Sequence, residues 1–211
     1  MVKSLFQKKE TVMKRALLSL LVVAGCAAMN VGCESEPKSP EQQESMRDDA
    51  RAALSSMQSK DNTLDDVINH AAGYVIFPNV GKGGLVIGGA QGRGEVFEKG
   101  KFIGYAQLQQ ASVGLQAGGQ TFRELIVFQD QAALDRFKAG KVEFAANASA
   151  VALKAGAGAS AEFKDGIAVF VEPTGGLMAE ASVGGQRFTF TPAEGPANRG
   201  NPAEPRTSTN Q

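Results

Sequence analysis

A glycine-rich segment with two basic residues is the first part of the chain whose composition could do chemistry. Residues 81–97 read GKGGLVIGGAQGRGEVF, in which seven glycines accompany Lys82 and Arg93. A phosphate-binding loop of the G-x-x-x-x-G-K-[ST] type needs Ser or Thr after its lysine and a helix after the loop. Here Gly83 follows Lys82, and the residues after Gly94 read as a strand, a turn and another strand. The segment therefore predicts a structural hairpin rather than a nucleotide site.

The histidine, serine and cysteine residues of the chain do not form a pattern typical of a catalytic or zinc site. The single histidine, His70, falls late in a predicted helix, where a helix C-terminal cation or an interface residue is the expected role. Ser112, Ser160 and Ser182 lie outside any G-x-S-x-G nucleophile elbow. The two cysteines form no cluster with the histidine that could hold zinc. We predict no enzyme, no metal and no cofactor.

Cys26 is a candidate for covalent lipid attachment. Lys14 and Arg15 precede an apolar run, residues 16–25, that is too short to span a bilayer and has the length of a signal-peptide core. The run ends in VAGC, which resembles the bacterial lipobox, so Cys26 would carry acyl chains such as palmitate and become the mature N-terminus. Acylation of Cys33 instead, or a secreted protein in which the two cysteines pair, remain alternatives. Ala27 resembles the sorting signal for the outer membrane.

The composition divides the chain into four parts. We predict a signal peptide over residues 1–25, a lipidated tether over 26–40, a folded domain over 41–192 and a disordered tail over 193–211. Met13 is an alternative start to Met1. The formal net charge is zero, but removing the signal peptide takes away five basic residues and one acidic residue. The negative remainder argues against nucleic acid as a partner, because such domains are strongly basic.

Three helices are expected from capping residues and apolar spacing. The first begins at Ser39-Pro40, and its apolar residues share one face. Asn62 is the expected cap of a second helix, which Gly73 ends. A short third helix, QAALDRFK, follows Asp130 as its cap.

The rest of the domain reads as strands. Apolar runs such as YVIF, FRELIVF and GIAVFV are separated by glycine, proline or Glu-Lys-Gly turns. Residues 145–161 are predicted to form two strands with very small side chains. Alternate small residues from Val86 to Val96 leave one flat face that helices would cover, while Leu85 and Ile87 pack on the other side. The predicted fold is α+β and β-dominated, with a strongly curved antiparallel sheet or a closed barrel, against which two N-terminal helices and one inserted helix pack.

Four blocks of sequence, in order, resemble one family. They are AAGYVIFPNVGKGGLVIGGAQGRGEVF, ASVGLQAGGQTFRELIVF, KVEFAANASAVA and GGLMAEASVGG, and together they resemble the SYLF domain over about residues 61–191. The resemblance implies a domain that binds membrane lipid, with anionic lipids and phosphoinositides as ligands of eukaryotic members. Some members also bind actin, which the predicted bacterial envelope excludes here. Lys82 falls on the family's common lysine, whereas Asn147 and Glu172 depart from its pattern.

Seven basic residues are candidate lipid contacts, since each charge near an anionic surface contributes about 1 kcal/mol. Ordinary solvated charge is the alternative for each. They fall around the glycine hairpin and at the end of the third helix: Lys82, Arg93, Lys99, Lys101, Arg136, Lys138 and Lys141.

Two functions follow from these observations. The first is a non-enzymatic outer-membrane lipoprotein, facing the periplasm, whose SYLF-like domain binds phospholipid. The alternative is a structural or interaction lipoprotein that docks an envelope protein partner and has no lipid site of its own.

Overall fold

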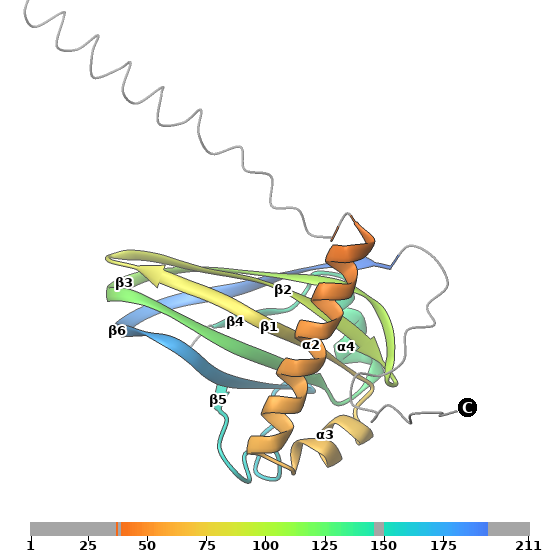
Figure 1. Cartoon of the computed structure of the whole chain (residues 1–211). Coiled ribbons are helices and arrows are strands. Elements are labelled where there is room, and N and C mark those ends of the chain that lie inside the picture. The colour runs from red at the N-terminus through yellow and green to blue at the C-terminus, as the bar shows by residue number, and fades with distance from the viewer. Residues whose placement is uncertain (1–36, 38, 146–149, 194–211) are drawn as a thin grey trace, which may run out of the picture. The chain divides into compact units, whose positions relative to one another are not determined.

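The computed structural model describes residues 37, 39–145 and 150–193, which belong to the compact unit Ser35–Gln211. Figure 1 shows this part as helices and strands. Side chains of residues 143–150 and 179–183 are not described. The predicted signal peptide (1–25), Cys26, most of the predicted tether (26–40) and the predicted tail after residue 193 lie outside the described residues.

The three predicted helices are present, the first begins at the predicted Ser39-Pro40, and the third has its predicted cap, Asp130. Helix α2 (Pro40–Lys60) follows Ser39, whose hydroxyl accepts a hydrogen bond from the Gln42 backbone N–H at 3.2 Å. Helix α4 (Gln131–Lys138) follows Asp130, whose carboxylate accepts from the Ala133 N–H at 2.8 Å. Helix α3 (Leu64–His70) instead has Thr63 at its N-cap position, so the prediction of Asn62 was one residue off.

Six strands form one sheet. They are β1 (Gly73–Gly84), β2 (Ile87–Glu98), β3 (Lys101–Phe128), β4 (Glu143–Ala145), β5 (Ala150–Ala152) and β6 (Ile167–Pro192). The strand order is β1-β2-β3-β6-β4, with β5 also on β6 and β1 also on β3. The predicted β-dominated α+β class is confirmed. The prediction of a purely antiparallel sheet is wrong, because β5 runs parallel to β6.

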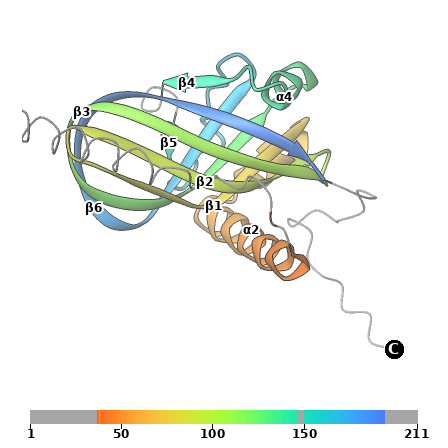
Figure 2. The same ribbon diagram turned by 90° about the horizontal axis from the view of Figure 1, so that it is seen from above.

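Strand β3 is long enough to pair with both strands of the hairpin before it. Its first part, up to Val113, pairs with β2, and its second part, from Gly118, pairs with β1. Strand β6 follows β3 from the Phe128–Ile167 pair to the Gly104–Pro192 pair. The two long strands therefore bend together around the β1–β2 hairpin, and the sheet curls strongly, as Figure 2 shows.

The curl stops short of a closed barrel. Strand β4 pairs with β6 near Arg187, and β5 pairs with the other arm of β6 near Phe170. Among the described residues no ladder joins β4 to β5. The sheet is therefore open, and the closed-barrel alternative is not supported.

Two apolar cores lie on the two faces of the sheet. The outer core joins α2 and α3 to the face that carries Tyr74 and Phe97, which stack with ring centroids 4.9 Å apart. Buried residues of α2 recur at helical spacing, so one face of the helix packs on the sheet. They are Ala50, Ala53, Leu54 and Met57.

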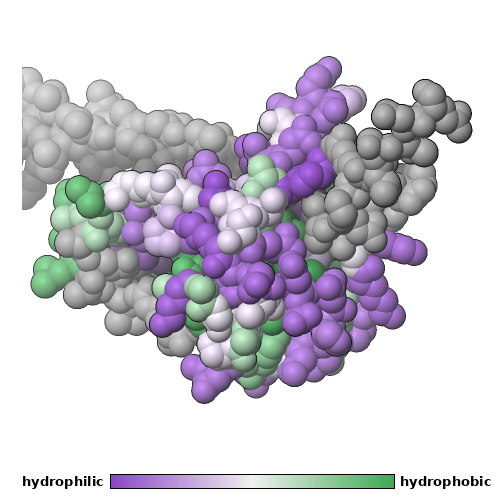
Figure 3. Space-filling view, turned by 60° about the horizontal axis from the view of Figure 1, so that its bottom comes forward, coloured by the Kyte–Doolittle hydropathy of each residue, from purple (hydrophilic) through white to green (hydrophobic). Residues whose placement is uncertain are grey.

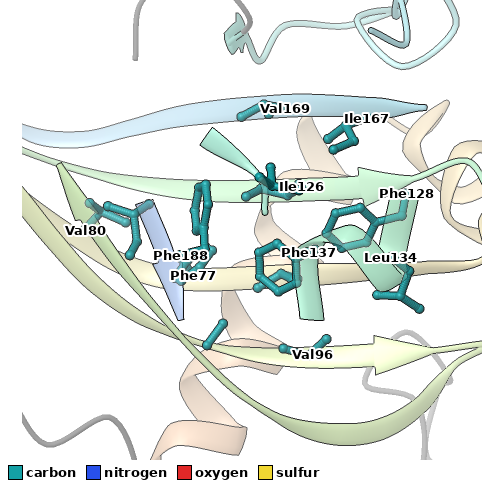
Figure 4. Close-up of a cluster of buried hydrophobic side chains, with 14 of the residues drawn as sticks. Phe77, Val80, Val96, Ile126, Phe128, Leu134, Phe137, Ile167, Val169 and Phe188 are labelled. Carbon is teal, nitrogen blue, oxygen red and sulfur yellow. The ribbon is translucent and has the colours of Figure 1, made fainter. Parts of the chain in front are cut away.

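The inner core fills one end of the curl (Figure 4). Phe137 of α4 packs 5.0 Å from Phe128 and 5.5 Å from Phe188, measured between ring centroids. The face of β2 that carries small residues at alternate positions, with Ala90 and Val96, faces the inner core. A side chain at Gly92 would meet Val80 of β1, so the curled sheet itself covers much of this face, with α4 near the Val96 end. The prediction that helices lie over this face is therefore only partly right.

Residues 145–161 differ from the prediction of two small-residue strands. Among the residues of this range that the structure describes, the end of β4 and all of β5 are strands, and residues 153–161 form turns and loop. The buried carboxylate of Asp61 holds this loop, because it accepts hydrogen bonds from the backbone N–H groups of Gly156 at 3.0 Å and Gly158 at 2.7 Å. These long-range bonds leave no signal in local residue spacing.

Glu172 of β6 connects the sheet to α2. Its carboxylate is 2% exposed and lies 2.5 Å from the Lys60 ammonium and 2.9 Å from the Arg123 guanidinium. Burial alone raises the pKa of Glu172, but its hydrogen bonds and charge interactions with Lys60 and Arg123 outweigh this, so the pKa is lowered. Ionised Glu172 therefore stabilises the fold above the usual glutamate pKa, and this stability is lost as the pH falls through the lowered value.

We expect Glu172→Gln to lower the free energy of unfolding by about 2 kcal/mol near neutral pH, because two cations lose their shared carboxylate. The loss should shrink toward zero in acid, where the wild-type carboxyl is itself protonated. Urea unfolding followed by circular dichroism at neutral and acidic pH measures both values. Asp48→Asn is the matched control, since Asp48 pairs with Arg51 at 2.9 Å while 61% exposed. A pH-independent loss at Glu172 would contradict the ionic role.

Candidate functional site

A layer of polar side chains ends the inner core. Residues two apart on a strand share a face, and on three strands a buried polar residue lies two positions from an apolar residue of this core, on the side toward the bend. Glu124 lies between Ile126 and Phe122, which both belong to the core. The pairs are Val80 and Lys82 on β1, Leu108 and Gln110 on β3, Ile126 and Glu124 on β3, and Phe188 and Gln186 on β6. We call Lys82, Gln110, Glu124 and Gln186 the polar layer. Each of them is at most 9% exposed.

Gln186 connects the polar layer by hydrogen bonds. Its amide nitrogen donates to Glu124 Oε2 at 3.1 Å and to Gln110 Oε1 at 3.5 Å. Gln110 Nε2 and Glu124 Oε1 have no hydrogen-bond partner among the described protein atoms. Of these two side chains, Gln110 lines the cavity described below, so its amide donor is available to a molecule that enters the curl.

Glu124 is the titratable group of this layer. Burial raises the pKa of its carboxyl to about 7, although the hydrogen bond from Gln186 acts in the opposite direction. Near neutral pH the carboxyl therefore exchanges between a protonated form, which can donate a hydrogen bond, and an ionised form, which only accepts.

A cavity of about 1170 Å³ begins at the polar layer and extends toward the bend of β3. Both arms of β3 and β6 and the β1–β2 hairpin line it, so it lies within the curl. The lining combines backbone of glycines with long polar side chains. The glycines are Gly81, Gly83, Gly89, Gly119, Gly176 and Gly185, and the polar side chains include Lys82, Gln110, Gln120, Thr121, Gln186 and Arg187.

Gln116 fills the inside of the bend beyond the cavity. Its amide accepts a hydrogen bond from the Ser112 hydroxyl at 3.0 Å, and both side chains are buried. A side chain at Gly88 would overlap the Gln116 amide, so glycine is needed at this close approach. The glycines of the hairpin therefore allow close packing, in agreement with the prediction of a structural hairpin.

The seven predicted lipid contacts do not gather in one place. Lys82 lines the cavity, while Arg93 is exposed in the middle of β2. Lys99 and Lys101 are exposed at the β2–β3 turn, at the other end of the sheet from the bend of β3. The remaining three, Arg136, Lys138 and Lys141, lie in or just after α4.

Two cations of α4 have structural partners. Lys138 lies 2.9 Å from Asp135 and 3.4 Å from Glu98, and Arg136 donates to the Asp165 carbonyl oxygen. The hydrogen bond and charge of Asp135 and Glu98 raise the pKa of Lys138 despite its partial burial. A shared cationic rim made of all seven residues is therefore absent among the described residues.

The His70, Ser112 and Ser160 side chains lie in three different segments of the fold, and no hydrogen bond among the described residues joins them to one another. His70 is exposed at the end of α3, with Nδ1 2.7 Å from the Asp66 carbonyl oxygen. Ser160 donates to the Gly156 carbonyl, and Ser112 is bound to Gln116. In the described part of the chain no three His, Cys, Asp or Glu residues are grouped as metal ligands would be.

Comparison with known families gives one match. Residues 109–195, less than half of the chain, match the family model Ysc84, described as Las17-binding protein actin regulator. This match supports a SYLF domain at residues 109–195. This confirms the family predicted from sequence, and it indicates a domain of the lipid- or actin-binding type. No curated protein matched the chain.

The matched part of the SYLF domain contains three members of the polar layer, Gln110, Glu124 and Gln186, while Lys82 precedes it. Sequence reasoning found Lys82 and missed the other three, together with Arg187. An available signal was the period-two pattern in which a polar residue takes an inward position directly after apolar ones, as in Ala106, Leu108 and Gln110. No helix in the described residues is long and apolar enough to cross a bilayer.

Proposed function

We propose that the protein is a non-enzymatic lipoprotein of the bacterial outer membrane whose SYLF domain binds phospholipid on the periplasmic side. The apolar run before Cys26, the lipobox-like VAGC and Ala27 support the anchor and its membrane. Each buried CH₂ of an acyl chain contributes about 0.8 kcal/mol, so two or three chains on Cys26 hold a protein firmly.

The cavity at the polar layer is the observation that carries the lipid-binding part. Its volume of about 1170 Å³ can take a headgroup with part of its acyl chains, since ligand sites typically occupy about 300–1,000 Å³. A phospholipid offers phosphate oxygens to donors such as the Lys82 ammonium and Gln110 Nε2.

Native mass spectrometry of the Ser35–Gln211 fragment, purified from bacteria, tests this function. Both cores lie between Met46 and Ala193, so the fragment retains every described core contact and has no acylated cysteine. We expect a phospholipid-sized adduct that leaves on denaturation and is identified in a lipid extract. A clean apo mass, unchanged after incubation with vesicles of phosphatidylethanolamine and phosphatidylglycerol, would contradict the lipid site and favour an envelope protein partner.

Lys82→Gln should reduce the lipid-bound fraction. A hydrogen bond to a charged group contributes about 1.5–3 kcal/mol, so we expect at least a tenfold weaker affinity in lipid titrations followed by native mass spectrometry. Lys99→Gln is the matched control, because it removes the same charge at the other end of the sheet. Equal losses for both variants would show that general positive charge, and not the cavity, attracts the lipid.

A further inference from the structure

Exposed large hydrophobic side chains gather at a single place on the described part of the protein. There are six, with exposed fractions between 63% and 90%, and all lie where the β1–β2 hairpin turns and where β3 and β6 bend. Figure 3 shows hydrophobic residues at this end of the sheet. We call them the apolar tip: Leu85, Val86, Ile87, Val113, Leu115 and Leu177. The prediction that Leu85 and Ile87 pack against the sheet is wrong, because they are 72% and 74% exposed.

The apolar tip is continuous across three turns of the chain. Ile87 is paired with Val113, and Leu177 is paired with Gly119 in the second arm of β3. The hairpin and the bend are bonded through their backbones, because Gln116 N–H donates to the Leu85 carbonyl at 2.9 Å and Gly114 N–H donates to the Val86 carbonyl at 3.0 Å. Backbone groups paired in this way can leave water at low cost, whereas unpaired groups cannot.

The strands behind the apolar tip are free of charge for several residues. Residues 83–92, 110–122 and 173–179 contain no Asp, Glu, Lys, Arg or His. At about 3.3 Å per residue, the uncharged residues behind the tip, from two on β1 to five on β2 and seven on the second arm of β3, span at least about 7 Å on each strand. This depth matches the roughly 5–10 Å to which interfacial elements enter a membrane. On β6 the uncharged segment lies between two acidic residues, Glu180 and Glu172, of which Glu172 is paired with Lys60 and Arg123.

On β1, β2 and the second arm of β3, basic residues begin where the uncharged segments end: Lys82, Arg93 and Arg123. Lys82 lies three residues before Leu85, and Arg93 lies six residues after Ile87. Arg187 of β6 is paired with Gln109 of β3, which in turn is paired with Gln91 of β2. An aliphatic end followed by cations fits a bilayer, whose hydrocarbon lies beneath anionic phosphates. The same order opposes a tip-to-tip dimer of two copies, because it would bring like charges toward each other.

We propose that the apolar tip inserts into the phospholipid membrane and points the bend of the curled sheet at the bilayer. The cavity then lies at the level of the headgroups, next to the lipid that it binds. This inference rests on the proposed lipid-binding function, and it adds the surface through which the domain meets the membrane.

A single fluorescent label tests the insertion directly. The Ser35–Gln211 fragment contains no cysteine, so Val86→Cys and Ala139→Cys each create one site for an environment-sensitive dye. Val86 is in the apolar tip, and Ala139 is exposed beside α4. With vesicles of phosphatidylethanolamine and phosphatidylglycerol, we expect a blue shift at residue 86 and quenching there by lipids spin-labelled on their acyl chains. The dye at residue 139 should keep its aqueous spectrum.

A triple variant measures the contribution of the tip. Leu85→Ser, Ile87→Ser and Leu177→Ser together should weaken vesicle binding at least 100-fold, since each inserted aliphatic side chain is worth about tenfold. Thermal unfolding should stay unchanged, because these side chains are exposed in the fold. The control, Lys99→Ser with Lys101→Ser, changes exposed residues at the other end of the sheet and should bind vesicles within about twofold of the wild type.

The outcomes separate the two proposals. A bound phospholipid in native mass spectra together with an aqueous dye at residue 86 on vesicles would overturn insertion and leave lipid binding intact. A blue shift at residue 86 that appears without vesicles, with a dimeric mass, would assign the tip to a second copy instead. Fragment that stays unbound at every vesicle composition, and carries no lipid, would overturn both proposals.

Discussion

Gly118→Val is expected to lower the free energy of unfolding by about 4 kcal/mol, because the bend of β3 has no room for a side chain there. Gly118 has a φ of +115°, which L-residues rarely adopt, and it sits where β3 begins to pair with β1. A Cβ atom at this position would overlap the Leu177 carbonyl oxygen of β6. Valine therefore forces β3 and β6 apart at the point where both strands turn.

Gly81→Ala is the matched control for this prediction. Gly81 lies in the neighbouring part of β1, and a Cβ atom there would meet nothing within 4 Å. Its backbone needs no left-handed conformation, so alanine should be neutral or stabilise by about 0.5 kcal/mol. Urea unfolding of both variants followed by circular dichroism gives the two values. A Gly118→Val protein as stable as Gly81→Ala would show that the bend can be built in another way.

The second large effect is expected for Glu124→Gln, which should stabilise the protein by about 3 kcal/mol above pH 8 and leave it unchanged near pH 4. Burial raises the pKa of Glu124 to about 7, so the folded state favours the protonated carboxyl. Stability from this group is complete below the usual glutamate pKa and is lost as the pH rises through about 7. Glutamine is neutral at every pH and retains an oxygen that can accept the Gln186 hydrogen bond.

Unfolding free energies of wild type and Glu124→Gln between about pH 4 and pH 9 measure this difference directly. Glu98→Gln is a suitable control, because Glu98 is 29% exposed and pairs with Lys138 near the helix end of the sheet. The control should show no gain at high pH. A constant difference between Glu124→Gln and wild type across the range would mean that Glu124 is already ionised, or already neutral, throughout.

Local features were predicted well from the sequence, because their causes are local. Helix α2 begins at the predicted Ser39-Pro40, and α4 has its predicted cap at Asp130. These ends depend on side chains within three residues of the backbone groups they satisfy. The family assignment also came from ordered blocks of residues and is confirmed by the match over residues 109–195.

Features set by distant residues were harder to predict. The sequence indicated separate short strands, whereas β3 and β6 run unbroken through their glycines because each is held by the other. Leu85 and Ile87 looked like core residues, since nothing local distinguishes a strand from the turn of a long hairpin. Of the seven predicted lipid contacts only Lys82 lines the cavity, because positions of charge along the chain do not fix their positions around a curled sheet.

Strand β3 pairs with β2 through its first arm and with β1 through its second, and this arrangement also affects the order in which the sheet can assemble. Strands β1, β2 and β3 are consecutive, so their ladders close over short loops and can nucleate early. The ladder between β3 and β6 starts at Phe128–Ile167 and must then zip to Gly104–Pro192, which are much farther apart along the chain. Until β6 arrives, the edge of β3 stays open to pairing with other chains. We therefore expect completion of β6 to be the slow step of folding and the step that protects the chain from aggregation.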